Sequence, residues 1–428
     1  MKLAGAKRQT LFVTAVNAVV RALGLLLRML LSRLLGAELM GIAELAQSVH
    51  MAAIAPLTSG LPVAVSRLTA RAAPGKRHLP ANAGILIVRI TSLILIPLFW
   101  LLSPVLARLT GDLRVLPSLW FTAPCILLLG YSAVYNGYCY GMEWSVHPAI
   151  SELLEQASRI VIVLGLIHAL RWLSAPWLAS IPVVSTLGAE IIGLIYIFCA
   201  VRLPHPRNAE ERPWVKPLLN LSAPATFSRL VQTLLRSITA ILIPLRLQHS
   251  GLSAAEATAR LGMLNGMVMP ILMLPCIFTS AISMVSMPKM ARAEEKPGEL
   301  RRILGLCTAA LLPVSVLCSC LIYFAAPFLS VRLYRMPELT ELFRRCSPMA
   351  VMFAVSHLSG SVLSALGLQL RSMLASVIVS CITLLFTWCL AGNPALRLHG
   401  VVMAQFAGQL LSILSALLVL WLWRRKRH

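Results

Sequence analysis

The sequence predicts an all-α integral membrane protein with about twelve membrane-spanning helices arranged in two lobes of six. Three observations support this fold class: an apolar composition, a regular succession of apolar segments and an internal repeat. Of the 428 residues, 58% are hydrophobic and only 12% are charged. A soluble domain needs more polar surface than this composition supplies, so we expect the chain to cross a bilayer many times.

Apolar segments long enough to span a bilayer recur along the whole chain. The predicted spans are 10–35, 40–66, 82–107, 116–140, 149–171, 176–201, 217–246, 258–288, 303–328, 345–367, 372–391 and 399–423. The first span follows a short basic stretch, as the apolar region of a signal peptide does. It is too long for a signal peptide, contains arginine and lacks a cleavage site of small residues, so we expect it to be retained.

The distribution of lysine and arginine predicts the orientation, because these residues are enriched in cytoplasmic connections. With a cytoplasmic N-terminus, the basic connections at 67–77, 202–216 and 289–302 and the tail at 424–427 lie inside. The outer connections carry about half as many basic residues, chiefly in one loop at 332–345. Both termini should therefore be cytoplasmic. We expect the net charge of +23 to set the orientation of the chain in the membrane and to contact anionic lipid. No nucleic acid partner is expected.

The first span is unusual because it carries three arginines in a leucine-rich helix. One guanidinium at the centre of a membrane helix costs roughly 3 kcal/mol on insertion scales, so a chain that keeps them is expected to use them. Helical spacing of i, i+4, i+7 and i+11 collects four residues on one narrow polar face. These residues are Asn17, Arg21, Gly24 and Arg28. We expect this face to line a cavity or to meet partner helices.

The two halves of the sequence match each other, in order, at three constant offsets. The matched pairs are Arg21/Arg229, Gly24/Gln232 and Arg28/Arg236; Gly41/Gly262, Glu44/Asn265, Ser59/Ser280 and Arg71/Arg292; and Pro124/Pro348 and Gly141/Ala365. Because each half has an even number of spans, the repeat is parallel, as in transporters built from two bundles. We predict an N-terminal lobe at 1–201, a cytoplasmic linker at 202–217 and a C-terminal lobe at 218–428.

The repeat suggests a cationic site between the halves. Arg21 and Arg28 would face Arg229 and Arg236 across a pseudo-two-fold axis, and arginine binds phosphate through two parallel hydrogen bonds. The predicted ligand is a phosphate or pyrophosphate group. The alternative is that the arginines pair with acids inside the bundle. Seven arginines lie within spans, against four acids, namely Glu44, Glu152, Glu155 and Glu190.

A second polar group lies on one face of the fifth span, where Glu152, Glu155, Gln156 and Arg159 follow helical spacing. We expect this group to supply a counter-charge that steers or releases the ligand, or a carboxylate that carries a proton. The alternative is an internal ion pair between Glu155 and Arg159. Prolines in the second and eighth spans predict bends that suit a rocking motion.

Several absences narrow the function. The sequence has no P-loop motif, no H-E-x-x-H motif and no long extramembrane loop that could hold a catalytic domain. Its ten cysteines are scattered and form no zinc-binding pattern. We therefore expect no enzyme, no metal and no cofactor, and transport driven by a gradient or the membrane potential.

The sequence RALGLLLRMLLSRLLGAELMG at Arg21–Gly41 resembles the opening motif of the stage V sporulation protein B family. That family comprises polysaccharide-transporter-like members of the multidrug/oligosaccharidyl-lipid/polysaccharide (MOP) flippase superfamily. Further similar segments are GLPVAVSRLTA at Gly60–Ala70, ISELLEQASRI at Ile150–Ile160 and LPCIFTSAISMVSMPKMARA at Leu274–Ala293. The chain departs from the family in its short length, its compact linker and Leu39, where a glycine is usual.

The resemblance implies a V-shaped fold of two six-helix lobes, as in MATE transporters, and flipping of lipid-linked peptidoglycan or oligosaccharide precursors. It also implies that Arg28 and Arg21 match basic positions of the family's first helix. Glu155 and Arg159 match its E-Q-x-x-R element. The predicted substrate-binding residues are Asn17, Arg21, Arg28, Glu44, Glu155, Arg159, Arg229 and Arg236.

We expect an alternating-access flippase of the bacterial cytoplasmic membrane that carries an undecaprenyl-pyrophosphate-linked cell-wall precursor or oligosaccharide. Its expected partners are that lipid-linked glycan, the surrounding lipids and cell-wall synthesis enzymes, with the transporter itself a monomer. One alternative is a cation or drug exporter of the same superfamily. Another is a non-transporting scaffold for cell-wall synthesis.

Overall fold

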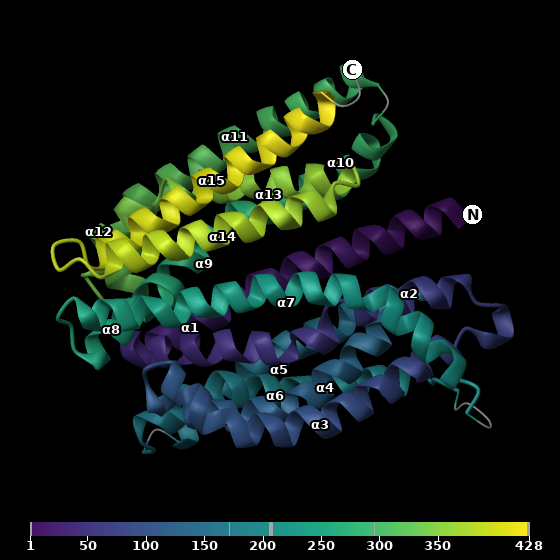
Figure 1. The fold of residues 1–428 in the computed structure, drawn as a ribbon, viewed down its shortest axis with the longest axis horizontal. Coiled ribbons are helices and arrows are strands. Elements are labelled where there is room, and N and C mark those ends of the chain that lie inside the picture. The colour runs from purple at the N-terminus through teal and green to yellow at the C-terminus, as the bar shows by residue number, and fades with distance from the viewer. Residues whose placement is uncertain (1, 171, 205–208, 295, 426–428) are drawn as a thin grey trace. The chain divides into compact units, whose positions relative to one another are not determined.

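The computed structural model describes residues 2–170, 172–204, 209–294 and 296–425, and this part of the chain contains helices and no strand (Figure 1). Residues 205–208 of the predicted linker and Lys426 and Arg427 of the basic tail lie outside the described residues. Contacts between helices divide the chain into two compact units. Unit 1 comprises Met1–Leu35 and Ile42–Ser237, and unit 2 comprises Gly36–Gly41 and Ile238–His428. The predicted boundary at 202–217 between moving lobes stays a prediction.

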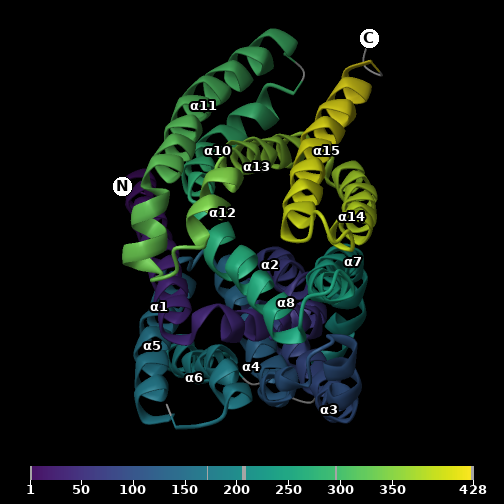
Figure 2. The same cartoon turned by 90° about the vertical axis from the view of Figure 1, so that its left-hand side faces the viewer.

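Unit 1 is built from long helices that pack in a fixed order. The helices are α1 (Lys2–Thr58), α2 (Leu61–Arg71), α3 (Leu79–Leu109), α4 (Leu116–Gly141), α5 (Val146–Leu170), α6 (Ala175–Ala200) and the first part of α7 (Arg212–His249), with short turns η1 (Pro74–Lys76) and η2 (Leu113–Val115). Helix α5 packs on α6, α6 on α4, and α4 on α3 and α2 (Figure 2).

Unit 2 repeats this order of neighbours. Its elements are the end of α7, α8 (Ala254–Leu261), η3 (Gly262–Val268), α9 (Met269–Leu272), α10 (Pro275–Arg292), α11 (Pro297–Pro327), η4 (Phe328–Leu333), α12 (Leu339–Cys346), α13 (Met349–Ala365), α14 (Gln369–Ala391) and α15 (Leu398–Arg425). Helix α14 packs on α15, α15 on α13, and α13 on α11 and α10. These contacts correspond one by one to those of α5, α6, α4, α3 and α2, as a repeat predicts.

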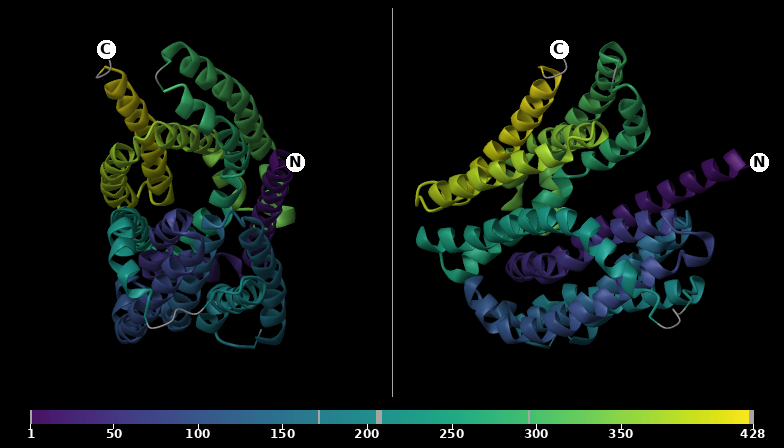
Figure 3. Two further views of the ribbon diagram at one scale, coloured as in Figure 1. Left: turned by 90° about the vertical axis from the view of Figure 1, so that its right-hand side faces the viewer. Right: turned by 45° about the vertical axis from the view of Figure 1, so that its right-hand side comes forward.

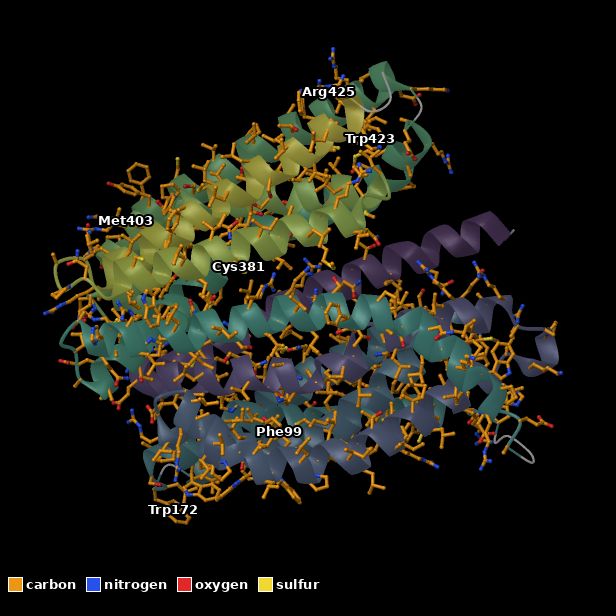
Figure 4. The ribbon with its side chains drawn as sticks, in the orientation of Figure 1. Phe99, Trp172, Cys381, Met403, Trp423 and Arg425 are labelled. Atoms are coloured by element: carbon orange, nitrogen blue, oxygen red, sulfur yellow. The ribbon has the colours of Figure 1, made fainter. Side chains whose placement is uncertain are left out.

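The described chain has eight helices that are long and apolar enough to cross a membrane, or ten if each of two bent pairs counts as one span. One pair, Ala254–Leu272 with Pro275–Ser283, is bent by 46°, which confirms the bend predicted for the eighth span. The other, Leu339–Cys346 with Met349–Ala365, is bent by 45°. Apolar side chains cover the outside of each unit, and Met403 and Cys381 are exposed examples (Figure 4).

Helix α1 contains the first predicted span and most of the second without a loop between them. This helix begins at the N-terminus and is drawn in purple in Figure 3. Within it, Gly36 has a φ of 78° and a ψ of 176°, which are not helical. Glycine has no Cβ, so it adopts a positive φ with little strain. The helix ends at Thr58, about four turns after Glu44, and Pro62 lies in the first turn of α2.

Small residues let the helices of unit 1 approach closely, as is common in membrane bundles. At Gly137 of α4, an added Cβ would lie 2.6 Å from the carbonyl oxygen of Pro62 and 3.0 Å from its Cα. Around Gly165 of α5, no atom lies within 4 Å of the added Cβ. The first position therefore cannot accept a methyl group without moving backbone, whereas the second can.

We expect Gly137→Ala to lower the thermal stability of the purified protein in detergent by about 1–3 kcal/mol, because overpacking forces the backbones of α2 and α4 apart. Gly165→Ala is the matched control, and it should be neutral or stabilising because alanine favours a helix. Thermal unfolding monitored by size-exclusion chromatography measures both. Equal melting temperatures for the two variants would contradict this packing.

Candidate functional site

The polar face of α1 lies against α5 inside unit 1. Beside that face, Val16 and Val20 are buried against Ala149 of α5. The Oε1 atom of Gln156 lies 4.0 Å from the position that a Cβ would take at Gly24. The amide of Gln156 on α5 therefore lies close to the middle of this polar face. The face found from sequence spacing is therefore a contact between helices.

Arg28 forms an ion pair with Glu44, with 3.1 Å between Nη1 and Oε1. In a straight helix, these residues would lie about 24 Å apart along the axis. The break at Gly36 turns the second arm of α1 back, so that Glu44 reaches Arg28. The arginine side chain is still 40% exposed and the glutamate 16%. For Arg28, the structure thus favours the alternative that an internal acid is its partner, while part of its guanidinium faces outward.

Arg21 of α1 and Arg159 of α5 both lie near the same acid, Glu152. Glu152 interacts electrostatically with Arg21 of α1 and with Arg159 of its own helix. Both Arg21 and Glu152 are exposed, whereas Arg159 is half-buried. Asn17 lies one turn before Arg21 and is also half-buried. The structure therefore brings the two polar groups predicted from sequence, on the first and fifth spans, into one cluster.

Glu155 does not form the predicted ion pair with Arg159. In the described chain, Arg159 has no acid within ion-pair distance, although the two charges interact at longer range. Glu155 Oε1 instead accepts a hydrogen bond of 3.0 Å from the hydroxyl of Ser151. Its carboxylate also packs on Gly193 of α6, where a Cβ would lie 2.6 Å from the Cγ of Glu155. The close packing of α6 therefore holds this carboxylate in place.

Glu190 of α6 belongs to the same cluster, although it was not among the predicted site residues. It is 4% exposed, hydrogen-bonds with Ser132 and interacts electrostatically with Arg159. Among the residues described, its Oε2 has no hydrogen-bond partner, and neither do Gln156 Oε1 and Arg159 Nε. Buried polar atoms are rarely unpaired, so Arg159 Nε–H can still donate a hydrogen bond to a polar ligand, and the oxygens of Glu190 and Gln156 can still accept one. In the sequence, the only sign that Glu190 belongs to this cluster is that it is an isolated acid within an apolar span.

Arg229 and Arg236 lie two turns apart on one face of α7 and interact electrostatically with each other. Both are exposed, and neither forms an ion pair within the described part of the chain. Helix α7 is held beside the second arm of α1 by a hydrogen bond of 2.6 Å from the Ser237 hydroxyl to the carbonyl oxygen of Ser48. The site on α7 is therefore part of unit 1, like all the other predicted site residues.

The charges of this site are unevenly distributed. The cluster of α1, α5 and α6 contains four acids and three arginines, namely Glu44, Glu152, Glu155, Glu190, Arg21, Arg28 and Arg159. The pair on α7 forms no ion pair with an acid of the described residues. Thus, the acids of the bundle largely neutralise the first cluster, whereas α7 presents two like charges that repel each other and favour an anion. Within the described residues, no group of side chains is arranged to hold a metal ion.

Comparison with known proteins identifies the family. Residues 6–294 match the sequence profile of the polysaccharide biosynthesis protein family, which is more than half of the chain. The chain belongs to the polysaccharide biosynthesis protein family. It is also 27% identical to stage V sporulation protein B of Bacillus subtilis (strain 168), over 94% of this chain and 81% of that protein. The resemblance found in the sequence motifs is thereby confirmed.

Solved structures of the MOP superfamily share the fold of this polysaccharide biosynthesis family member. An inward-facing multidrug resistance MATE transporter matches with a TM-score of 0.72 and 17% identity, over 95% of this chain and 94% of that one. The lipid II flippase MurJ, in an inward closed conformation, matches with a TM-score of 0.72 and 12% identity, over 95% and 87%. The chain therefore has the fold of these transporters, and with its long apolar helices it is a multi-pass membrane protein.

We expect Gly193→Ala to destabilise this family member, because the added methyl group would overlap the side chain of Glu155. Gly188→Ala on the same helix is the control, since its Cβ would meet only the flexible end of Ile162 at 3.0 Å. In a Glu155→Ala background, the loss from Gly193→Ala should shrink by about 1 kcal/mol or more, as coupled contacts require. The readout is thermal unfolding of the four variants of the cycle. Additive losses would show that Glu155 does not pack on residue 193.

Proposed function

We propose that this protein is a flippase that moves an undecaprenyl-pyrophosphate-linked cell-wall precursor or oligosaccharide across the membrane by alternating access. The observation that carries the proposal is the pair Arg229 and Arg236. Two guanidinium groups within an apolar helix, without an acid partner in the described chain, are costly unless an anion binds them. A pyrophosphate supplies two adjacent anionic groups, and arginine binds each through paired hydrogen bonds.

The α1 cluster would complete this site. Arg21 is exposed, and the Arg28 side chain, paired with Glu44, is 40% exposed. Glu44 then acts as an internal counter-ion, which holds Arg28 in the empty site and competes with the ligand for it. Glu155 and Arg159 lie deeper and position the polar face of α5, and Asn17 extends the face of α1. The predicted set of site residues is kept, with more weight on α7 than the sequence suggested.

The proposal includes a location and an orientation. The family membership supports a bacterial cytoplasmic membrane, and the basic connections support cytoplasmic termini. The expected partners are the lipid-linked glycan, membrane lipids and cell-wall synthesis enzymes, with the transporter as a monomer. The similarity to stage V sporulation protein B is compatible with a role in spore or vegetative cell-wall synthesis.

We expect Arg229→Ala and Arg236→Ala each to reduce precursor translocation by about tenfold or more, because a hydrogen bond to a charged group contributes about 1.5–3 kcal/mol. Arg21→Ala and Arg28→Ala should also reduce it, and Arg33→Ala should not, since Arg33 lies on another face of α1. Translocation is measured in vesicles containing purified protein at equal density. Wild-type rates for all four site variants would refute the assignment.

The acids of the α1, α5 and α6 cluster favour a second candidate, an exporter of lipophilic cations. Four carboxylates in one polar group could attract a cation from the membrane. Efflux of tetraphenylphosphonium from the same vesicles, abolished by Glu152→Gln and unaffected by lipid-linked precursor, would select this function. Protein that binds the precursor but never moves it would select the scaffold.

A further inference from the structure

Arg89 of α3 lies within a predicted span and takes no part in the site proposed above. Its side chain is exposed on unit 1, and among the residues described it forms no ion pair with an acid. The neighbouring side chains of Ile90, Leu93 and Ile94 are 54%, 77% and 60% exposed. A surface this apolar on a membrane helix faces lipid tails, where a guanidinium without a counter-charge is costly. Arg89 therefore needs a partner that the described chain does not supply.

Aromatic side chains from α4 and α6 position the Arg89 guanidinium. These two helices pack beside each other, and α4 also packs on α3, in the lower part of Figure 2. Arg89 Nε donates a hydrogen bond of 2.9 Å to the hydroxyl of Tyr131 on α4. Tyr135, one turn further along α4, interacts electrostatically with both Arg89 and Tyr131. The ring centroid of Phe198 on α6 lies 6.3 Å from that of Tyr131 and 4.7 Å from that of Tyr135.

The other edge of the guanidinium remains available. With Nε bound to Tyr131, the terminal nitrogens Nη1 and Nη2 of Arg89 have no hydrogen-bond partner within the described part of the chain. These nitrogens end a planar fork whose parallel N–H groups fit two oxygens of one phosphate. The hydroxyl of Tyr135 likewise has no hydrogen-bond partner in the described chain, so it can donate to the same anion.

The depth of Arg89 in the membrane suits the phosphate of a lipid. Helix α3 begins at Leu79 and has 31 residues, so Arg89 lies about 15 Å along a helix about 46 Å long. In a bilayer centred on α3, with a hydrocarbon core about 30 Å thick, the Cα of Arg89 lies about 7 Å inside that core. The long stem of arginine brings its guanidinium from this depth to the headgroups, and tyrosine is enriched at the same level.

We propose that Arg89, Tyr131 and Tyr135 bind the phosphate of an anionic phospholipid on the membrane-facing surface of unit 1. The terminal nitrogens of Arg89 bind two phosphate oxygens, and the hydroxyl of Tyr135 donates to the same group. The acyl chains lie along the exposed side chains of Leu93 and Ile94. An anionic lipid is preferred to a zwitterionic one, because a zwitterionic headgroup already carries its own cation. This site is independent of the transported substrate.

An arginine that only extends its side chain to the headgroups predicts a different outcome. Such an arginine needs its charge and its flexible stem, and it does not depend on a neighbouring hydroxyl. In the proposed site, the Tyr131 hydroxyl orients the guanidinium, so that the free edge of the fork meets the phosphate. Loss of that single hydroxyl therefore distinguishes a built site from an arginine without one.

The test places a photoreactive benzophenone amino acid at residue 90, next to Arg89. The same probe at residue 109, next to Arg108 at the other end of α3, is the position control. Both native side chains are exposed, 54% for Ile90 and 61% for Leu109. The full-length protein is placed in nanodiscs of equimolar phosphatidylglycerol and phosphatidylethanolamine with identical acyl chains. After illumination, mass spectrometry identifies the lipids crosslinked at each position.

We expect phosphatidylglycerol to be enriched about tenfold over phosphatidylethanolamine at residue 90, because charge-assisted hydrogen bonds hold its phosphate. At residue 109 the ratio should stay within about twofold of the bulk value, because an exposed charge alone contributes little. Arg89→Gln should return residue 90 to the bulk ratio, and Tyr131→Phe should lower the enrichment by about threefold or more. Arg108→Ala is the control substitution and should leave the ratio at residue 90 unchanged.

The bulk ratio at residue 90 in the wild type, or an enrichment that survives Arg89→Gln, would overturn the site. An enrichment that survives Tyr131→Phe would also overturn it, and would leave an arginine that only reaches the headgroups. Excess inorganic phosphate, compared with chloride at equal ionic strength, should not reduce the enrichment. A loss in phosphate alone would overturn the lipid as the occupant. Where Arg89→Gln is not monodisperse, the wild type and Tyr131→Phe decide.

Discussion

The structure of unit 1 depends on the need to place arginine side chains inside apolar helices. A guanidinium in a membrane segment must find an acid, a polar cavity or an anionic ligand. On α1, Arg21 and Arg28 lie on one face of the helix. The second arm of α1 turns back and brings Glu44 to Arg28. Helix α5 packs against the same face. Gly36 permits the break in α1, and Gly193 leaves room for the side chain of Glu155.

The charged residues of unit 1 fall into two groups. The acids of α1, α5 and α6 offset the charge of the arginines among them, although three buried polar atoms of that cluster have no hydrogen-bond partner among the described residues. The pair on α7, Arg229 and Arg236, has no such compensation in the described chain. A transporter needs a site that binds an anion and also releases it. In the proposed site, Arg229 and Arg236 would bind the anion, and the carboxylates of the first cluster would favour its release.

Local spacing and the repeat could be predicted from the sequence, and the packing that completes the site could not. The polar face of α1 follows from helical periodicity, and the matched order of neighbours in the two units follows from the repeat. The association of Glu155 with Gly193 and of Glu190 with Arg159 joins two helices through their packing, which no spacing reveals. The supposed Glu155–Arg159 pair fails because Ser151 is nearer to the carboxylate. The kink at Gly36 depends on a single glycine that resembles many others in the sequence.

The most direct test of the central claim, that unit 1 recognises an anionic headgroup, is a competition between two lipids with the same tail. Purified protein is mixed with equimolar undecaprenyl pyrophosphate and undecaprenol, and bound lipid is identified by native mass spectrometry. We expect the pyrophosphate to be retained over the alcohol by about tenfold or more, because charge-assisted hydrogen bonds distinguish the headgroups. Equal retention of the two lipids would contradict the account.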